Sequence, residues 1–203
     1  VNKVQTAYGI VDIMMHTLER YFCPSANDDL TDGIAEALLR SVIKAGKAVF
    51  ENPNEYDARA TLMYASSMSH NDLTNAGKIK NMPVHALEHA ISGMYPEVAH
   101  ASGLAVMFFP WAYAYVKNDI EKFNAFAEKV FHSFNDDKMK NALNGINLLR
   151  GYFDSLNMPK TFKDLGLLNV DINELANKVT SGGTRMLGRH KILFDKEAVK
   201  KMF

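Results

Sequence analysis

An all-α fold is predicted by three features of the sequence. Apolar residues recur at helical spacing through several long segments, capping residues, proline and glycine separate those segments, and strict apolar–polar alternation never persists for more than a few residues. The 203 residues are 47% apolar, which is enough for a sizeable core. Because there is no internal repeat, low-complexity tract or flexible linker, we expect a single domain over residues 1–203.

The first three helices are predicted from apolar spacing and from their ends. The first runs from Gln5 to Phe22 and ends before Cys23-Pro24, because a residue that precedes proline disfavours the α region. Asn27 or Asp28 can cap a second helix to about Phe50, and a third follows from about Glu55 to Asn71. The expected inward-facing residues are Leu30, Ile34, Leu38, Val42 and Val49 in the second helix and Ala60, Met63, Tyr64 and Ser67 in the third.

The middle of the chain contains a polar loop and an apolar run. The segment from Asn71 to Met82 is long enough to be a functional loop. Pro83 suits the first turn of the next helix, which Gly93 and Pro96 stop. Val98–Val116 carries no Asp, Glu, Lys or Arg, but Pro110 lies near its middle, so we expect two buried helical pieces and no membrane span.

The last third is predicted to be helical with short connections. Asn118 or Asp119 caps a helix to about His132, and others are expected over Asp137–Leu156, Thr161–Leu165, Asp171–Thr180 and Asp195–Met202. The glycine-rich segment Ser181–Gly188 precedes no convincing strand-to-helix switch. It is therefore expected to be a loop and is a poor candidate for a phosphate cradle.

Charge and cysteine content exclude several classes of function. Lys plus Arg equals Asp plus Glu at 23 each, so the chain lacks the basic surplus of a nucleic-acid-binding protein. Cys23 is the single cysteine, which excludes an internal disulfide and a zinc knot of several thiolates and favours a reducing cytoplasm. The chain begins with Val and shows no secretory signal, so a cytoplasmic location is expected.

Histidines at helical spacing indicate a metal site. Asp12 and His16 lie four residues apart on one predicted helix and His85 and His89 on another, so each pair can offer two ligand atoms on one face. His100 follows a helix break and can fold back towards the same point. One carboxylate with imidazoles suits Zn²⁺ or Fe²⁺. Spacing alone does not choose between His89 and His100, and hydrogen-bonded core histidines remain an alternative.

Other polar residues near these motifs are expected to lie outside the site. His70, His132 and His190 have no partner at ligand spacing. Glu19 and Glu88 lie near the candidate ligands and could orient imidazoles, but solvated or surface-paired carboxylates are the commoner outcome. Apolar residues around the motifs are expected to be ordinary core.

The same stretches resemble a known family. The motifs GIVDIMMHTLERY at Gly9–Tyr21 and VHALEHAISGMYPEVAHASGLAV at Val84–Val106, with NMPKTFKDLGL at Asn157–Leu167, are similar to those of the iron-containing (group III) alcohol dehydrogenases. Within that family they resemble the butanol dehydrogenase-like branch. The resemblance covers nearly the whole chain. It implies the C-terminal, dehydroquinate synthase-like helical bundle domain of such an enzyme.

The resemblance also implies roles for individual residues. It implies that Asp12, His16, His85 and His100 hold Fe²⁺ or Zn²⁺, and that His89 lies beside the nicotinamide and relays a proton. It implies NAD(P)H as the hydride carrier and a small primary alcohol or aldehyde as substrate. A homo-oligomer is also expected, because a cleft normally covered by the cofactor domain would leave apolar surface exposed. The family's N-terminal nucleotide-binding domain is expected to be absent from this chain, which leaves the activity of this part alone in question.

Two alternatives stay open at the level of sequence. One is a helical domain that binds a metal or a partner without catalysis, which the expected lack of a nucleotide domain favours. The other is a relative of the zinc-dependent glycerol dehydrogenases, against which the spacing of Asp12 and His16 argues.

Overall fold

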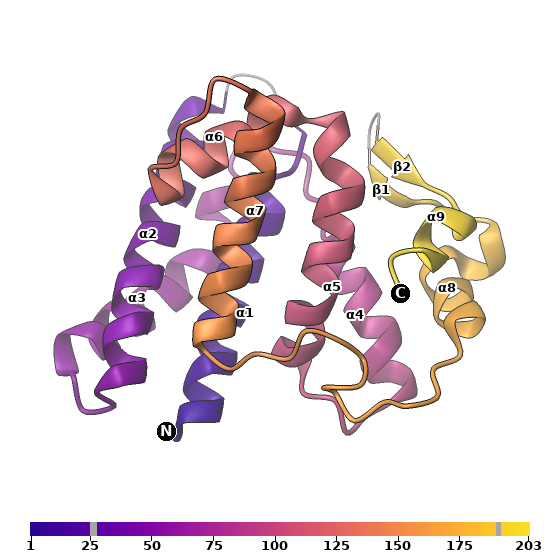
Figure 1. Cartoon of the computed structure of the whole chain (residues 1–203), viewed down its shortest axis with the longest axis horizontal. Helices are drawn as coiled ribbons and strands as arrows, with labels where there is room; N and C mark the ends of the chain where they lie inside the picture. Colours follow the sequence, from indigo (N-terminus) through magenta and orange to yellow (C-terminus); the bar gives the residue numbers. More distant parts are fainter. Residues whose placement is uncertain (25–27, 190–191) are drawn as a thin grey trace.

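The protein is built from α-helices, as its sequence predicts. The computed structural model describes residues 1–24, 28–189 and 192–203. Within these ranges the strands are β1 (Leu187–Arg189) and β2 (Ile192–Phe194), which pair antiparallel in one short hairpin (Figure 1). β1 begins within Ser181–Gly188, which was expected to be a loop, and β2 lies beyond that segment; the sheet content of the described residues stays small.

Most of the helices follow one another with short connections, and the longer connections follow His70 and Ser155. In chain order they are α1 (Lys3–Tyr21), α2 (Asp29–Glu51), α3 (Tyr56–His70), α4 (Pro83–Met94), α5 (His100–Tyr115), α6 (Ile120–Phe131), α7 (Lys138–Ser155), α8 (Ile172–Thr180) and α9 (Lys196–Lys200), with single 3₁₀ turns at η1 (Leu73–Asn75), η2 (Val116–Asn118) and η3 (Ser181–Gly183). Several helix starts are set by aspartates whose side chains accept a backbone N–H of the first turn, namely Asp119, Asp137, Asp171 and Asp195.

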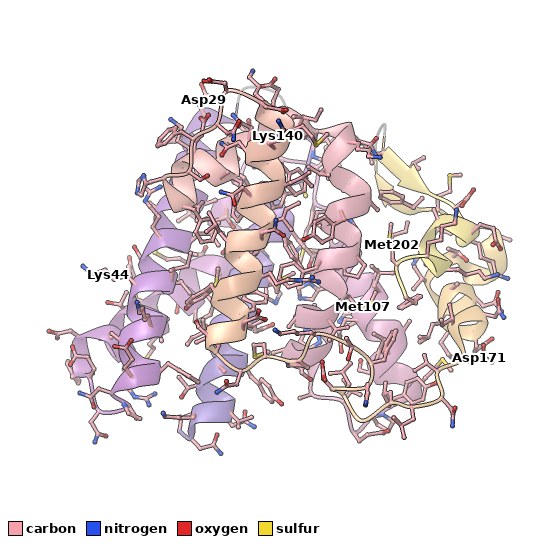
Figure 2. The ribbon with its side chains drawn as sticks, viewed as in Figure 1. Asp29, Lys44, Met107, Lys140, Asp171 and Met202 are labelled. Carbon is pink, nitrogen blue, oxygen red and sulfur yellow. The ribbon has the colours of Figure 1, made fainter. Side chains whose placement is uncertain are left out.

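Helix α1 is the centre of the packing that positions the site. It contacts α2, α3 and α5, and α4 packs between α5 and α8. The hairpin, α8 and α9 lie on the far side of α4 and α5 from α2 and α3 (Figure 1). The core side chains form one connected cluster in which Phe22 stacks on Phe123, with ring centroids 4.1 Å apart. Met107 belongs to this core, whereas Lys44 and Lys140 are exposed on the surface (Figure 2).

The structure corrects two predicted elements. Val98–Val116 is not split at Pro110, because α5 continues through the proline as one helix. Proline removes one intrahelical hydrogen bond, and here the surrounding packing is dense: Phe108 and Trp111 on either side are almost fully buried. Thr161–Leu165 forms turns in place of a helix. The turn ends at Gly166, whose φ of 82° is incompatible with continuing a right-handed helix.

The predicted inner faces of α2 and α3 were wrong in part. Leu30 is 79% exposed at the start of α2, and Met63 and Tyr64 are 77% and 71% exposed on α3, where Ala60 and Ser67 are exposed as well. The buried face of α3 is instead formed by Ala58, Leu62, Ala65 and Ser69. Both faces of this helix carry apolar residues at helical spacing, so periodicity alone could not choose between them.

The start of α2 depends on charge pairing. Asn27, one of the two predicted capping residues, lies outside the described residues. Asp28 occupies the cap position, but its carboxylate pairs with Lys78 and Lys122, each at 3.2 Å.

No helix in the described part of the chain is both long enough and apolar enough to cross a membrane.

Candidate metal centre

The first two candidate ligands are placed by α1. This helix buries Ile10, Met14 and Leu18, so Asp12 and His16 lie at the edge of its buried face, with side chains 32% and 20% exposed. His16 Nε2 is 3.8 Å from Asp12 Oδ1. The four-residue spacing therefore brings the two side chains together, as the sequence predicts.

His85 is held at the start of α4 by a buried carboxylate from α1. Glu19, 1% exposed, accepts the backbone N–H groups of Val84 at 2.5 Å and His85 at 3.2 Å through Oε1. Its other oxygen, Oε2, contacts His85 Nδ1. A carboxylate only accepts hydrogen bonds, so Nδ1 carries the hydrogen and the lone pair of the neutral ring is on Nε2. Glu19 thus caps α4 and orients His85 at the same time.

His100 is oriented in the same way by α4. The Oε2 atom of Glu88, a residue with no exposed surface, contacts His100 Nδ1 and leaves the Nε2 lone pair available. Gly103, one turn along α5, makes room for this carboxylate, since a Cβ there would lie 2.8 Å from Glu88 Cγ. His100 Nε2 lies 3.7 Å from Asp12 Oδ1.

These side chains converge on Asp12. Donor atoms of Asp12, His16 and His85 lie within 4.8 Å of one another, and His100 reaches the same carboxylate. Three polar atoms of the group are buried without a hydrogen-bond partner in the described residues: Asp12 Oδ1, His16 Nδ1 and His85 Nε2. Burying unpaired polar atoms is costly, and a cation bound by Asp12 Oδ1 and His85 Nε2 offsets that cost for these two acceptors. One carboxylate and several imidazoles therefore fit a transition-metal ion such as Fe²⁺ or Zn²⁺.

His89 lies at the outer side of this cluster. It is exposed on α4, with its ring centroid 5.5 Å from that of His100 and 5.9 Å from that of His85. Glu88, His89 and His100 also have donor atoms within 4.8 Å of one another. His89 is therefore close to the candidate ligands and open to solvent.

Burial sets the electrostatics around α1. Burial, together with the nearby His85 and His70, lowers the pKa of His16 to about 3, so its ring is neutral at physiological pH. The hydrogen bond to Glu88 is the main cause that raises the pKa of His100. Burial also raises the pKa of the Cys23 thiol to about 11. This agrees with a structural role for that residue and argues against a reactive thiolate.

Sequence reasoning missed three members of the cluster. Glu19 and Glu88 were expected at the surface, yet both are buried against imidazoles. His70 was excluded for want of a partner at helical spacing, yet its ring centroid is 3.9 Å from that of His16 and its Nε2 is 3.7 Å from Asp12 Oδ2. Its partners lie on α1, so no spacing within α3 could reveal them.

His132 ends α6 at the surface, and His190 lies outside the described residues.

A cleft of about 690 Å³ lies close to the cluster but does not contain it. It is bordered by the start of α1, residues 97–99, Ser102 and the connection after α7, and none of the candidate ligands lines it. The histidine cluster, and not this cleft, carries the chemistry-bearing side chains.

Comparison with known proteins places this chain in a family. Residues 6–203 match the family model described as the Fe-containing alcohol dehydrogenase family, C-terminal. The chain is 38% identical to NADH-dependent butanol dehydrogenase A of Clostridium acetobutylicum over 189 residues, which cover 91% of this chain and 48% of that protein. It is 32% identical to the NADPH-dependent aldehyde reductase YqhD of Escherichia coli over 196 residues, 94% of this chain and 49% of that one.

Solved structures agree with the sequence matches. A structure of NADH-dependent butanol dehydrogenase A from Thermotoga maritima superposes on the whole chain with a TM-score of 0.90 at 28% identity and is covered over 52% of its length. The chain therefore spans about half the length of the relatives that it matches. From its motifs, its helical fold and these matches together, the chain belongs to the Fe-containing alcohol dehydrogenase family and corresponds to the C-terminal part of its members.

Proposed function

We propose that this chain is the metal-binding, catalytic part of an NAD(P)-dependent alcohol dehydrogenase or aldehyde reductase that acts on a small primary alcohol or aldehyde. One observation supports it above the others: two imidazoles whose Nδ1 atoms are held by buried glutamates direct Nε2 lone pairs to the region of Asp12. The relatives whose names include butanol dehydrogenase and aldehyde reductase support the reaction class.

The proposed ligands are Asp12, His16, His85 and His100, and the proposed ion is Fe²⁺ or Zn²⁺. When bound, such an ion supplies Lewis-acid polarisation of the alcohol or carbonyl oxygen, while a nicotinamide supplies or accepts the hydride. Glu19 and Glu88 contact the Nδ1 atoms of His85 and His100, which places the lone pair of each neutral ring on Nε2 and fixes its direction. The chain thus orients its donors before any ion binds.

His89 is proposed as the proton relay. It is exposed and adjacent to His100, so it can exchange a proton with solvent while remaining near the reacting oxygen. The assignment of His100 as ligand and His89 as relay is supported by the 3.7 Å approach of His100 Nε2 to Asp12.

The remaining parts of the enzyme are proposals as well. We assign the nicotinamide cofactor to an N-terminal nucleotide-binding domain outside residues 1–203, which form the helical metal-binding domain. The intact enzyme is proposed to be a cytoplasmic homo-oligomer, and light scattering after size-exclusion chromatography measures its assembly.

Elemental analysis tests the site directly. The purified chain, loaded with Fe²⁺ under anaerobic conditions or with Zn²⁺, is expected to hold about one ion per chain. His85→Ala and His100→Ala are expected to lose that ion, whereas His89→Ala keeps it. In the full-length enzyme His89→Ala is expected to lower hydride transfer by about 10²–10⁴-fold, measured as nicotinamide absorbance, because it removes a proton-transfer group.

Two results would contradict the proposal. Metal retention by His100→Ala would remove it from the ligand set, and wild-type turnover by His89→Ala would remove the relay. A full-length protein that binds metal but never transfers hydride would favour a non-catalytic metal-binding role.

A further inference from the structure

His70 lies beside the candidate metal centre but has no part in the proposed ligand set or proton relay. It is the last residue of α3, and its side chain is 41% exposed. Its Nδ1 lies 2.9 Å from the Ser66 carbonyl oxygen and 2.8 Å from Ser69 Oγ. Ser69 Oγ itself donates to the Ser66 carbonyl, so both neighbours of Nδ1 act as acceptors. The ring therefore carries its hydrogen on Nδ1.

This tautomer leaves a lone pair on Nε2 that faces a carboxylate. His70 Nε2 is 3.7 Å from Asp12 Oδ2, which is also an acceptor. The other oxygen of Asp12, Oδ1, is 3.8 Å from His16 Nε2 and 3.7 Å from His100 Nε2. Two acceptors that face each other are stabilised by a cation between them. Asp12 thus has one oxygen towards the expected ligands and the other towards His70.

The position of His70 is fixed by α1. The guanidinium of Arg20, a residue 3% exposed, donates from Nη1 to the backbone carbonyl of Ser69, and its Nη2 lies 3.2 Å from Asp72 Oδ1. Arg20 is one turn beyond His16 on the same helix. The end of α3 is therefore tied to α1 beside the candidate metal centre.

We propose that His70 is a fifth protein donor of the metal centre, binding through Nε2 next to Asp12. This proposal rests on the proposed metal site and deepens it. Two atoms that each lie about 2.1 Å from one ion are at most about 4.2 Å apart. Asp12 meets this limit with His16 and His100 through Oδ1 and with His70 through Oδ2, so an ion shared by all of them uses both oxygens of Asp12. The rings of His16 and His70 are adjacent, with centroids 3.9 Å apart.

A fifth donor changes the choice of metal. Zn²⁺ favours four ligands, whereas Fe²⁺ and Co²⁺ readily take five or six. One carboxylate with four imidazoles therefore favours Fe²⁺ over Zn²⁺ relative to the four-ligand set. Removal of His70 is expected to shift the ratio of affinities towards Zn²⁺.

Cobalt substitution gives a readout that is independent of turnover. Four-coordinate Co²⁺ absorbs visible light more strongly than five- or six-coordinate Co²⁺, and its affinity is measured by competition with a chelator. The full 203-residue chain is compared with His70→Asn and with the matched control His132→Asn, a surface position where a left-handed backbone suits asparagine. His85→Asn tests the centre itself.

Loss of His70 is expected to weaken Co²⁺ binding by more than about tenfold, since even residues outside the ligand set contribute 10–100-fold in such sites. It is also expected to intensify the visible bands, while His132→Asn changes neither. An unchanged spectrum and affinity, or tighter binding as expected for a His70–Asp12 ion pair that competes with the metal, would overturn the proposal.

Two further measurements separate the possible failures. If His85→Asn binds Co²⁺ as tightly as the wild type does, the proposed metal centre is wrong. If His70→Asn binds Co²⁺ like the wild type while His85→Asn does not, the metal centre stands and His70 is not one of its ligands. Should His70→Asn fold poorly by circular dichroism, His70→Gly with added imidazole replaces it. Recovery of the wild-type spectrum by imidazole supports ligation, and no recovery in folded His70→Gly contradicts it.

Discussion

At the scale of single residues, Glu19 joins two tasks that usually belong to different side chains. It accepts two backbone N–H groups at the start of α4 and holds the Nδ1 of His85. Any substitution that disturbs the carboxylate therefore affects both the helix end and the imidazole. Because both contacts are buried, water cannot replace them.

Glu19→Gln is expected to destabilise the chain by about 1–3 kcal/mol and to weaken metal binding by about 10–100-fold. An amide supplies only one acceptor oxygen, so either the helix end or Nδ1 loses its partner. Chemical denaturation and chelator competition measure the two effects. Glu121→Gln, at a side chain 73% exposed, is the control and should change neither quantity appreciably. Equal behaviour of the two variants would contradict the dual role.

At this scale the sequence indicated that the proposed ligands lie together more readily than it indicated the side chains that support them. Asp12 and His16 could be paired because a helix brings residues four apart together. Glu19, Glu88 and His70 could not be placed, because each acts across a helix–helix contact. Glutamate is rarely buried, so expecting these two at the surface followed the general rule. They are exceptions because of tertiary contacts. Each carboxylate contacts an imidazole, and that of Glu19 also contacts the N-terminus of α4.

At the scale of elements, the contact of α4 with α5 controls His100. Gly103 lets Glu88 lie between the two helices, and a Cβ at this position would be 2.8 Å from Glu88 Cγ and 3.1 Å from Oε1. The carboxylate has no free space to retreat into, because Glu88 is fully buried. The glycine is thus part of the support of the site although it contacts no ligand directly.

Gly103→Ala is expected to destabilise the chain by about 1–3 kcal/mol, because the added methyl group forces Glu88 or the helices apart. It should also weaken metal binding through His100. Gly151→Ala is the matched control: this glycine is helical and exposed, with nothing within 4 Å of the added Cβ, so the change should stabilise by about 0.5–1 kcal/mol. Thermal melts with and without metal compare them. A Gly103→Ala variant as stable as the wild type would refute the contact.

The loop before α4 is held by a buried lysine. The side chain of Lys78 is fully buried. Its Nζ lies 2.5 Å from Asp32 Oδ1 and donates to the Tyr21 carbonyl oxygen at 3.2 Å. Lys122 pairs with the same aspartate from α6. This ion group ties the end of α1 and the start of α2 to the loop that leads into α4.

Lys78→Met is expected to cost about 3 kcal/mol, because it removes a buried ammonium group and leaves the carboxylates of Asp28 and Asp32, which are 13% and 15% exposed, with one counter-charge fewer. Lys138→Met removes an exposed ion pair with Glu121 at 2.7 Å and should cost less than about 1 kcal/mol. Urea denaturation of both variants measures the difference. If the two costs are alike, the buried ion group is not a significant support.

Helix bounds were the most predictable property of the elements. Aspartate caps and apolar spacing located most helix ends within a few residues, because both signals are local. The failures lie where local signals conflict. α3 has an apolar stripe on each side, Pro110 stands inside a helix that packing keeps whole, and Gly166 limits the segment after α7 to turns.

At the scale of the whole molecule, the proposed ligands join α1, α4 and α5. An ion held by donors from three helices binds the folded chain and not the unfolded one, so it stabilises the fold by mass action. Free metal at about 1,000 times the dissociation constant contributes about 4 kcal/mol. For a chain of this size that corresponds to about 10 °C in melting temperature.

Chelation is therefore expected to lower the melting temperature of the metal-loaded chain by about that amount, and addition of metal should restore it. Scanning fluorimetry measures the shift. The His85→Asn variant serves as the control, since it lacks a proposed ligand and should melt at the same temperature with and without chelator. A wild-type chain indifferent to chelation would argue against a site that spans several helices.

The spread of the donors along the chain also bears on biosynthesis. Asp12 and His16 leave the ribosome before their proposed co-ligands His85 and His100, which follow only after α2 and α3 have been made. A nascent chain that ends before α5 thus offers an incomplete donor set. Since α6 to α9 contribute none of the proposed ligands, acquisition of the ion can begin once α5 has emerged, while the second half of the chain is still being translated.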